Sequence, residues 1–266
     1  MVVNVVTNSS NDLDEVIGCL KAAEVLTLDC EGVDLGRSGE LCLIQLATRE
    51  RCFLFDVHEL ATACCDMVIS LKEILEDNTI VKVVHDCKMD SDALFHHLGI
   101  RLANVHDTQA WDKVLRNSVG ENLNRTLLAF DCTPNVVRDC TIYSRNIRFW
   151  ATRPLTPKMI EWASGDVSSL FELRDKQCVE VSVDVREKAN TMSEANICFL
   201  RDAVTDECRI RHVGRFIGPG GSNIRALMKK IPGTFFQQRG GTGRFMVYAP
   251  DRVKLAAGLQ LLTKYQ

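Results

Sequence analysis

The stretch Val25-Leu-Thr-Leu-Asp29-Cys-Glu31-Gly32 places the strongest constraint on what this chain can fold into. It is an apolar run, typical of a buried strand, that ends in two carboxylates separated by one residue. Side chains two apart on a strand point to the same face, so Asp29 and Glu31 are predicted to project together from the end of the strand. Two carboxylates this close repel each other, and burial raises the cost further unless a cation lies between them.

A hard divalent cation such as Mg²⁺ or Mn²⁺ suits this pair, because both ions prefer oxygen ligands. The alternative is a strand that runs out into a solvated acidic turn. The choice between the two depends on whether further carboxylates follow at suitable places in the chain.

The order of the apolar segments predicts an α/β body. Three consecutive strands with short connections predict an antiparallel meander, and the alternation of strands and helices that follows is typical of an α/β domain. The expected strands are 2–6, 25–29, 41–47, 52–56, 79–85 and 105–109, and the expected helices are 11–23, 64–75, 86–98 and one that starts at Pro157.

More carboxylates lie at the start of the helix that follows the 79–85 strand. The segment His85-Asp86-Cys-Lys-Met-Asp90-Ser-Asp92 opens this helix. Acidic residues in a first helical turn are favoured by the helix dipole, and this is the structural interpretation of Asp86 and Asp92.

A further acid lies on the helix that Thr156 caps and Pro157 starts. Trp162 and Asp166 are four residues apart and therefore share a face with apolar neighbours. An acid on an apolar face needs a partner, and a metal ion is one candidate.

Composition excludes several classes of protein. With 46% apolar and 25% charged residues in 266 positions, the chain is typical of a soluble globular protein with one ordinary domain and a smaller one. The apolar start of the chain ends at Val6, and no later run approaches membrane-spanning length. We therefore expect an intracellular protein, cytoplasmic or nuclear, without a membrane partner. The twelve cysteines contain no C-x-x-C pair, which favours reduced core residues over disulfides or zinc ligands.

The charge is distributed unevenly along the chain. From Thr205 to the end there are eleven Lys/Arg and three Asp/Glu, a net charge of +8, whereas the rest of the chain has 21 basic and 32 acidic residues, a net charge of −11. This asymmetry favours metal-dependent chemistry in the first part and contact with a polyanion in the second.

The acidic motifs, in this order, resemble the DEDD superfamily of 3′–5′ exonucleases, and within it the RNase D and Rrp6-like branch. The sequence of residues 85–94 is most similar to Egalitarian-type exonuclease-domain proteins. The resemblance to the superfamily covers about 1–180 and includes Arg153-Pro-Leu, which precedes the last motif. It implies a ribonuclease H-like fold, a mixed sheet flanked by helices. It also implies two Mg²⁺ or Mn²⁺ ions held by Asp29, Glu31, Asp90 and Asp166, with Asp92 as the alternative to Asp90. One ion would activate a water and the other would stabilise the leaving 3′ oxygen.

One position departs from this family. Its tyrosine branch has a water-orienting Tyr four residues before the last Asp, where this chain has Trp162, whose indole is only a donor. Its histidine branch has His five residues before that Asp, where this chain has Glu161. Three interpretations remain open: Glu161 or a residue from elsewhere acts as the base, the metal ions alone give slow cleavage, or the site binds RNA without cutting it.

The basic part of the chain contains Val213-Gly-Arg-Phe-Ile-Gly218-Pro-Gly-Gly221-Ser-Asn-Ile between two predicted helices. This segment resembles a type I KH domain, a small α+β fold of order β-α-α-β-β-α, over about 205–266. In that family the G-x-x-G loop lies against the backbone of about four single-stranded nucleotides. Glycines permit this close approach, and the following helix offers amides to phosphate.

This loop lacks a basic residue in its middle, and Pro219 removes one amide, so nearby basic side chains would have to supply the attraction. Their alternative interpretation is ordinary solvated surface. Phe235, Phe236 and Phe245 are interpreted as core rather than as base-stacking residues. The predicted RNA contacts are Arg215, Gly218, Pro219, Gly220, Gly221, Arg225, Lys229 and Arg239.

The sequence therefore predicts an exonuclease domain at 1–180, a helical connector at 181–204 and a KH domain at 205–266. The predicted function is that of a metal-dependent 3′–5′ exonuclease acting on single-stranded RNA that the KH domain holds. One alternative is a catalytically weak or inactive adaptor whose domains bind RNA or protein partners. The other is an exonuclease acting on single-stranded DNA.

Overall fold

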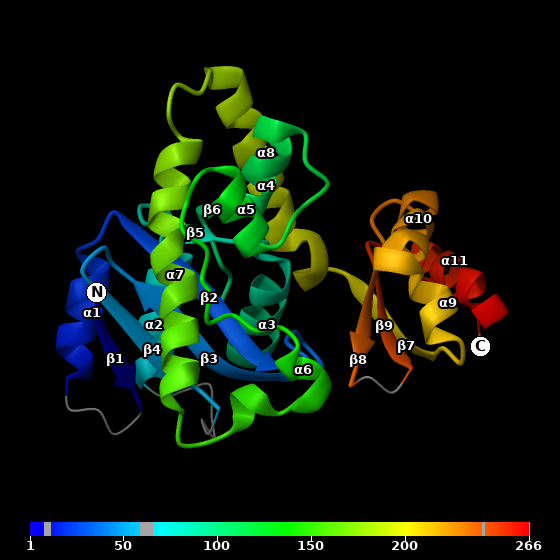
Figure 1. Cartoon of the computed structure of the whole chain (residues 1–266), viewed down its shortest axis with the longest axis horizontal. Helices are drawn as coiled ribbons and strands as arrows, with labels where there is room; N and C mark the ends of the chain where they lie inside the picture. The colour runs from blue at the N-terminus through cyan, green and yellow to red at the C-terminus, as the bar shows by residue number, and fades with distance from the viewer. Residues whose placement is uncertain (8–11, 59–65, 241–242, 266) are drawn as a thin grey trace. The chain divides into compact units, whose positions relative to one another are not determined.

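The computed structural model describes residues 1–7, 12–58, 66–240 and 243–265 (Figure 1). By its internal contacts the chain separates into two compact units, Met1–Ile197 and Cys198–Gln266. The division falls inside the segment predicted as a connector. Cys64 and Cys65 lie outside the described residues, and the ten cysteines that the structure describes form no disulfide.

The first unit is built on one six-stranded mixed sheet in the order β1-β4-β3-β2-β5-β6. The strands β2, β3 and β4 pair antiparallel, as the predicted meander requires, whereas β1 runs parallel to β4 and β5 runs parallel to both β2 and β6. This arrangement confirms the predicted α/β body. The strands are β1 (Val2–Val6), β2 (Val25–Val33), β3 (Glu40–Ala47), β4 (Arg51–Asp56), β5 (Val81–Val84) and β6 (Val105–Asp107).

Helices cover both faces of this sheet (Figure 1). One apolar core joins the strands to α1, α2 and α3, and a second core on the opposite face joins them to α7. The helices of this unit are α1 (Leu13–Lys21), α2 (Asp66–Glu76), α3 (Lys88–Leu98), α4 (Thr108–Arg116), α5 (Leu123–Ala129), α6 (Ile142–Arg145), α7 (Pro157–Gln177) and α8 (Val183–Arg201), with a short 3₁₀ turn η1 (Phe149–Ala151). None of the helices in the described ranges is both long and apolar enough to cross a membrane.

The strand β2 is longer than predicted. Its pairing with β3 continues past Asp29 as far as Val33, with a bulge between Glu31 and Gly32. Gly32 is required at the bulge, because a Cβ there would lie 1.9 Å from the carbonyl oxygen of Glu40. The two acids therefore lie inside a central strand and do not project from its end, which corrects the prediction.

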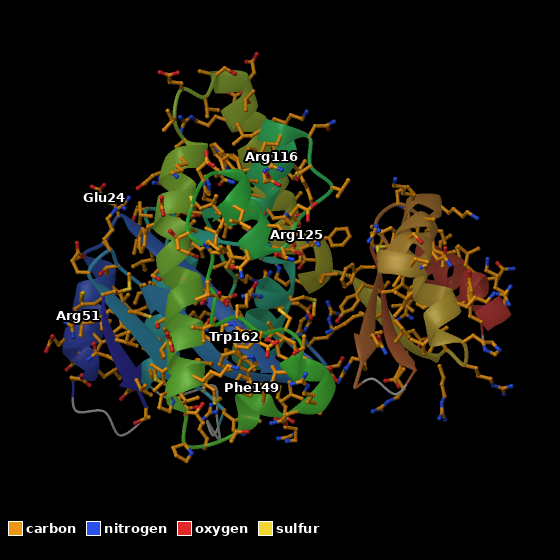
Figure 2. The ribbon with its side chains drawn as sticks, in the orientation of Figure 1. Glu24, Arg51, Arg116, Arg125, Phe149 and Trp162 are labelled. Carbon is orange, nitrogen blue, oxygen red and sulfur yellow. The ribbon has the colours of Figure 1, made fainter. Side chains whose placement is uncertain are left out.

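The helix α7 brings one more acid over this strand. It begins as predicted, with the Thr156 hydroxyl accepting a hydrogen bond from the amide of Met159 at 3.3 Å. Its inner face buries Trp162 completely, and the indole packs against the Phe149 ring at 5.8 Å between centroids (Figure 2). Asp166, one turn further along, is buried on the same face.

The helix α8 occupies most of the predicted connector and is attached to the sheet unit by hydrogen bonds. The hydroxyl of Ser91 on α3 donates to the carbonyl of Ile197 at 2.7 Å. Asn196 donates its amide to Asp107 Oδ2 at 2.7 Å, and the Ser193 hydroxyl accepts from the Asp107 amide at 3.2 Å.

The second unit has a three-stranded antiparallel sheet in the order β7-β9-β8. Its core surrounds Phe216, whose ring makes edge contacts with Phe236, Phe245 and Tyr265, so the core prediction for Phe236 and Phe245 is confirmed. Phe235 is half-buried against Tyr248. The elements are β7 (Val204–Arg209), α9 (Val213–Ile217), η2 (Pro219–Gly221), α10 (Ser222–Lys230), β8 (Phe235–Arg239), β9 (Arg244–Ala249), α11 (Arg252–Leu262) and η3 (Thr263–Tyr265).

Candidate active site

Three of the predicted acids meet between the sheet and α7. Asp29 and Glu31 alternate with buried apolar residues along β2 and share one face of the strand. Asp166 comes from the inner face of α7, and the three side chains have carboxylate oxygens that lie within 4.8 Å of one another.

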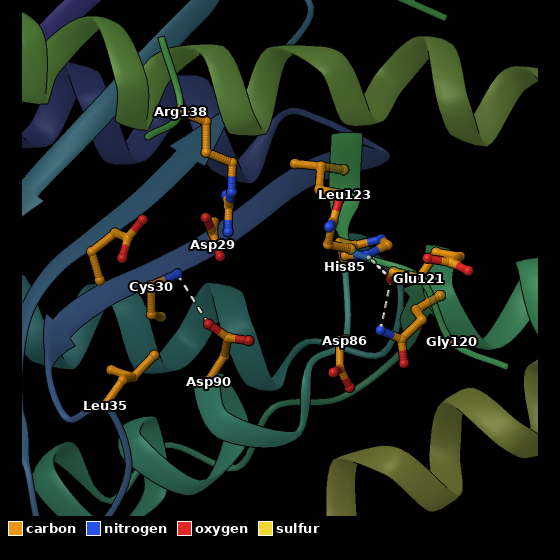
Figure 3. Close-up of a pocket in the computed structure, with 13 residues that line it drawn as sticks. Asp29, Cys30, Leu35, His85, Asp86, Asp90, Gly120, Glu121, Leu123 and Arg138 are labelled. Atoms are coloured by element: carbon orange, nitrogen blue, oxygen red, sulfur yellow. Dashed lines mark hydrogen bonds between the residues drawn. The ribbon is translucent and has the colours of Figure 1, made fainter. Parts of the chain in front are cut away.

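The fourth acid, Asp90, lies beside this group. It comes from the first turn of α3, is buried, and its Oδ1 accepts a hydrogen bond from the Cys30 amide at 3.0 Å. Asp90, Asp29 and Glu31 line a cavity of about 400 Å³, and Figure 3 shows Asp90 pointing toward β2. The structure therefore brings Asp90 to the site.

Asp92, the alternative to Asp90, has other partners. It is fully buried, and its carboxylate pairs with Arg37, whose Nε donates at 2.9 Å and whose amide donates at 2.6 Å. These contacts give Asp92 a structural role away from the lining of the cavity.

Burial and mutual repulsion hold these carboxyl groups in an unusual electrostatic state. Burial, together with the charge of Asp166, raises the pKa of Asp29 from 3.8 to about 7. Burial and the charge of Asp29 raise the pKa values of Glu31 and Asp90 well above their ordinary range. Clustered hard oxygen donors with too little positive charge around them fit a divalent cation.

Asp166 already has three protein partners, and nothing in the sequence indicated two of them, Asn135 and Arg138. Its Oδ1 accepts a hydrogen bond from Asn135 Nδ2 at 2.8 Å, and its Oδ2 accepts from Trp162 Nε1 at 2.9 Å. The guanidinium of Arg138 also pairs with Oδ2. Asn135 and Arg138 lie in an irregular segment about 30 residues before Asp166, and no periodicity or motif marks such a contact.

A tyrosine also reaches the site, from an element that sequence reasoning overlooked. The hydroxyl of Tyr143 on α6 lies 3.4 Å from Glu31 Oε2 and accepts a hydrogen bond from Trp150 Nε1 at 3.1 Å. Burial and the charge of Glu31 raise its pKa above the ordinary value, so the phenol stays protonated. Glu161 is exposed on α7 and does not line the cavity.

The turn between β5 and α3 that carries Asp90 is fixed from outside the site. Asp86 adopts a left-handed conformation with φ of 62°, which is uncommon for a residue other than glycine. Asp107 holds this turn, accepting from the Asp86 amide at 2.9 Å and from the Cys87 amide at 3.3 Å. Since Asn196 of α8 binds the same carboxylate, α8 supports the turn indirectly.

His85, at the start of this turn, has a hydrogen-bond partner at each ring nitrogen. Its Nδ1 is 2.9 Å from Thr108 Oγ1 and its Nε2 is 3.0 Å from the carbonyl of Glu121. Burial lowers its pKa to about 4, so the imidazole is neutral near pH 7.

In the second unit, the predicted glycine loop forms a tight turn between α9 and α10. Gly218, Gly220 and Gly221 all have positive φ, as glycine permits. Arg225 lies against the loop, because its Nη1 is 2.8 Å from the position that a Cβ on Gly221 would take. Arg215, Arg225 and Lys229 are exposed, Pro219 and Gly220 are exposed within the loop, and Arg239 is half-buried at the end of β8.

A model of the 3′–5′ exonuclease family matches residues 4–181, which include all four acids of the site. The chain belongs to this 3′–5′ exonuclease family. The chain is 33% identical over 180 residues to the mouse piRNA biogenesis protein EXD1, a match that covers 62% of this chain and 31% of the relative. It is 29% identical over 171 residues to the exosome complex exonuclease RRP6 of Saccharomyces cerevisiae, covering 64% of this chain and 22% of the relative. The chain thus spans about a third, or less, of the length of these curated relatives.

Solved structures share the fold of the exonuclease unit. Trypanosoma brucei RNase D superimposes with a TM-score of 0.63 at 23% identity, over 75% of this chain and 72% of that chain. Brucella melitensis NrnC, solved with bound Mg²⁺, superimposes with a TM-score of 0.59 at 20% identity, over 74% of this chain and 90% of that chain. At these identities the comparison establishes the mixed sheet flanked by helices and no more.

Proposed function

We propose that this chain is a metal-dependent 3′–5′ exonuclease that acts on single-stranded RNA. The observation that carries the proposal is the convergence of the Asp29, Glu31 and Asp166 oxygens within 4.8 Å, with Asp90 on the wall of the adjoining cavity. Membership of the 3′–5′ exonuclease family supports the reaction. The preference for RNA is supported by the likeness to an RNase D that was solved in complex with RNA U12.

Asp29, Glu31, Asp90 and Asp166 would hold two divalent ions, Mg²⁺ or Mn²⁺. When bound, such ions supply an activated water and stabilise the charge on the leaving 3′ oxygen. Four carboxylates in one buried place need this positive charge if all of them are to stay ionised.

Tyr143 would orient the attacking water, a task that the tyrosine branch of the family gives to a Tyr at the position of Trp162. Its hydroxyl is at hydrogen-bonding reach of the site, and the Trp150 N–H occupies one of its acceptor positions and so fixes its direction. Trp162 has a separate task, since its N–H holds Asp166. Glu161, exposed on α7, is the less suitable candidate for a base.

The second unit would act as a KH domain over 205–266 and retain the RNA. Its element order β-α-α-β-β-α and the positive φ angles of the loop glycines support this assignment. The loop, Pro219 included, would lie against the nucleotide backbone, with Arg215, Arg225, Lys229 and Arg239 as its cationic neighbours.

The proposal is tested with a 5′-labelled single-stranded RNA in the presence of Mn²⁺. We expect a ladder that shortens from the 3′ end, and we expect Asp29→Asn to abolish it while the exposed Asp14→Asn leaves it unchanged. A DNA oligomer of the same sequence, run beside the RNA, should be degraded more slowly. Equal or faster loss of the DNA would identify a DNA exonuclease instead.

A second candidate function is RNA binding without cleavage, as an adaptor. The three protein donors on Asp166 favour it, because they already satisfy much of a carboxylate that the reaction needs for an ion. Tight RNA binding with no ladder in either Mg²⁺ or Mn²⁺ would establish the adaptor and refute the nuclease.

A further inference from the structure

A positively charged side chain lies inside the acidic cluster. Arg138 extends from the irregular segment after α5 and pairs with Asp166, with its side chain 25% exposed. Figure 3 shows its guanidinium pointing toward Asp29, and its charged carbon lies 6.0 Å from the centre of the Trp162 ring. The guanidinium is therefore held between β2 and α7, the two elements that supply three of the four acids.

The cluster stabilises this charge strongly. Burial alone would lower the pKa of Arg138, but the charges of Asp166, Asp29 and Glu31 outweigh burial and raise the pKa above its ordinary value. Arginine cannot lose its proton under physiological conditions, so it cannot leave the site by becoming neutral. It can leave only if the side chain moves.

The position of Arg138 conflicts with an ion on Asp166. A carboxylate has four acceptor positions on its two oxygens, and Asn135, Trp162 and Arg138 use three of them. The donors from Asn135 and Trp162 are neutral and can remain beside a bound cation. The guanidinium is itself a cation, and it would repel a divalent ion bound to the same carboxylate.

We propose that Arg138 occupies one of the cation positions of the site, and that a divalent ion bound by Asp166 has to displace it. This inference rests on the proposed metal-dependent function. Because Arg138 pairs directly with Asp166, an ion held by Asp29, Glu31 and Asp90 competes less with the guanidinium than an ion on Asp166 does, so the two ions bind with unequal affinity. Arg138 thereby sets the divalent-ion concentration at which the second ion enters, and it supplies counter-charge to the acids while that ion is absent.

The test measures Mn²⁺ binding to the full chain, with free Mn²⁺ counted by its electron paramagnetic resonance signal. We expect the wild type to bind one Mn²⁺ tightly and a second at least tenfold more weakly. Arg138→Gln should strengthen the second site at least tenfold, while Arg145→Gln, an exposed residue nearby in the chain, should leave both sites unchanged. Equal binding in wild type and Arg138→Gln, or no binding of Mn²⁺ to either, would overturn the inference.

Thermal melting supplies a second readout that does not depend on cleavage. In EDTA, Arg138→Gln should melt below the wild type, because the acids lose a counter-charge, and saturating Mn²⁺ should raise its melting temperature by more than that of the wild type. If Arg138→Gln does not fold, Arg138→Lys replaces it: a lysine keeps the charge without the planar fork and should give an intermediate affinity. If Arg138→Lys binds Mn²⁺ with the same affinities as the wild type, the guanidinium has no specific role.

Binding and cleavage can fail separately. A wild-type chain that binds two Mn²⁺ unequally and does not shorten RNA would leave the inference standing and refute the proposed function. If the chain shortens RNA but Arg138→Gln leaves its Mn²⁺ affinities unchanged, the proposed function stands and the inference is overturned.

Discussion

At the scale of single residues, the site combines acids that the sequence indicates with neighbours that it does not. Asp29, Glu31 and Asp166 stand out because an acid within an apolar pattern needs a partner. Asn135, Arg138 and Tyr143 lie in irregular or short elements, and their contacts span 28 to 112 residues of chain. Only tertiary packing brings these three to the acids, so no local pattern could have revealed them.

Tyr143→Phe isolates the phenol at this site. It removes the hydroxyl near Glu31 and leaves the ring, so we expect kcat on single-stranded RNA to fall by about ten- to a hundredfold with little change in KM. Mn²⁺ affinity and the melting temperature should stay close to the wild-type values, because the ring itself is retained. Tyr248→Phe, which also removes a hydroxyl bonded to a neighbouring side chain, is the matched control. An unchanged kcat, or a large gain of activity in Trp162→Tyr, would show that Tyr143 does not orient the water.

The raised pKa of Asp29 predicts a pH dependence in the metal-free protein. Since the carboxyl has a pKa of about 7 in the folded state and 3.8 in the reference state, the folded protein binds more protons between these values. The contribution of Asp29 to stability is thus fully present below about pH 4 and is lost as the pH rises to 7, by at most about 4 kcal/mol.

Asp29→Asn removes this titration and also the charge that helps to raise the pKa values of Glu31 and Asp90, and both changes favour the variant over the wild type as the pH rises. In EDTA, the stability of Asp29→Asn relative to the wild type should therefore increase as the pH rises from 4 to 8, as measured by urea unfolding at several pH values. The lowered pKa of His85 makes stability increase with pH, opposite to Asp29, but it acts in both proteins and cancels in the comparison. A difference that does not vary with pH would contradict the assignment of Asp29 as a buried, uncompensated acid.

At the scale of elements, the periodicity of apolar residues predicted which strands and helices form better than it predicted where they end. The meander, the α/β alternation and the capped start of α7 followed from apolar spacing and from Thr156 and Pro157. The end of β2 was predicted too early, because the two acids resemble a strand end when the pairing with β3 is unknown. The support of the active-site turn by α8 could not be predicted, since it depends on Asn196, an ordinary polar residue on a helix.

This support connects α8 to the candidate active site, although the helix follows the segment that the family model matches. Asn196→Ala removes a 2.7 Å hydrogen bond to Asp107 Oδ2 and leaves this buried acceptor without one of its donors, so we expect a loss of about 2 kcal/mol of unfolding free energy. Asn190→Ala, an exposed residue of the same helix, should change it by less than about 0.5 kcal/mol. Chemical denaturation of the two variants checks the difference, and equal stabilities would show that α8 does not brace the turn.

At the scale of the whole molecule, charge asymmetry predicted two parts with different tasks. An acidic unit suits divalent ions, and a basic unit suits a polyanion, so each part can be tested without altering the other. Whether both parts act on the same RNA is beyond any local pattern of the sequence, because no short motif encodes a task that two separate folded units share.

Arg225→Gln tests the basic unit. If Arg225 contacts phosphate beside the glycine loop, its loss should weaken RNA binding similarly for all sequences and lower the dependence of log affinity on log salt concentration by about 0.7. Fluorescence anisotropy between low and moderate salt measures this slope, with the exposed Arg252→Gln on α11 as the control. An identical decrease in both variants would indicate a diffuse attraction by the basic unit and no specific contact at the loop.

The placement of Asp29 and Glu31 inside a central strand has a consequence for how the site responds over time. Amides of β2 that are bonded within the sheet, to β3 along the stretch with the two acids, exchange with solvent deuterium only through large openings, whereas the irregular segment that carries Asn135 and Arg138 has few such bonds. Hydrogen exchange at saturating Mg²⁺ should therefore leave β2 unchanged and alter the segment from 132 to 141. The two acids of the sheet then keep their places when an ion binds, and the segment that carries Asn135 and Arg138 adjusts around them within the lifetime of the folded state.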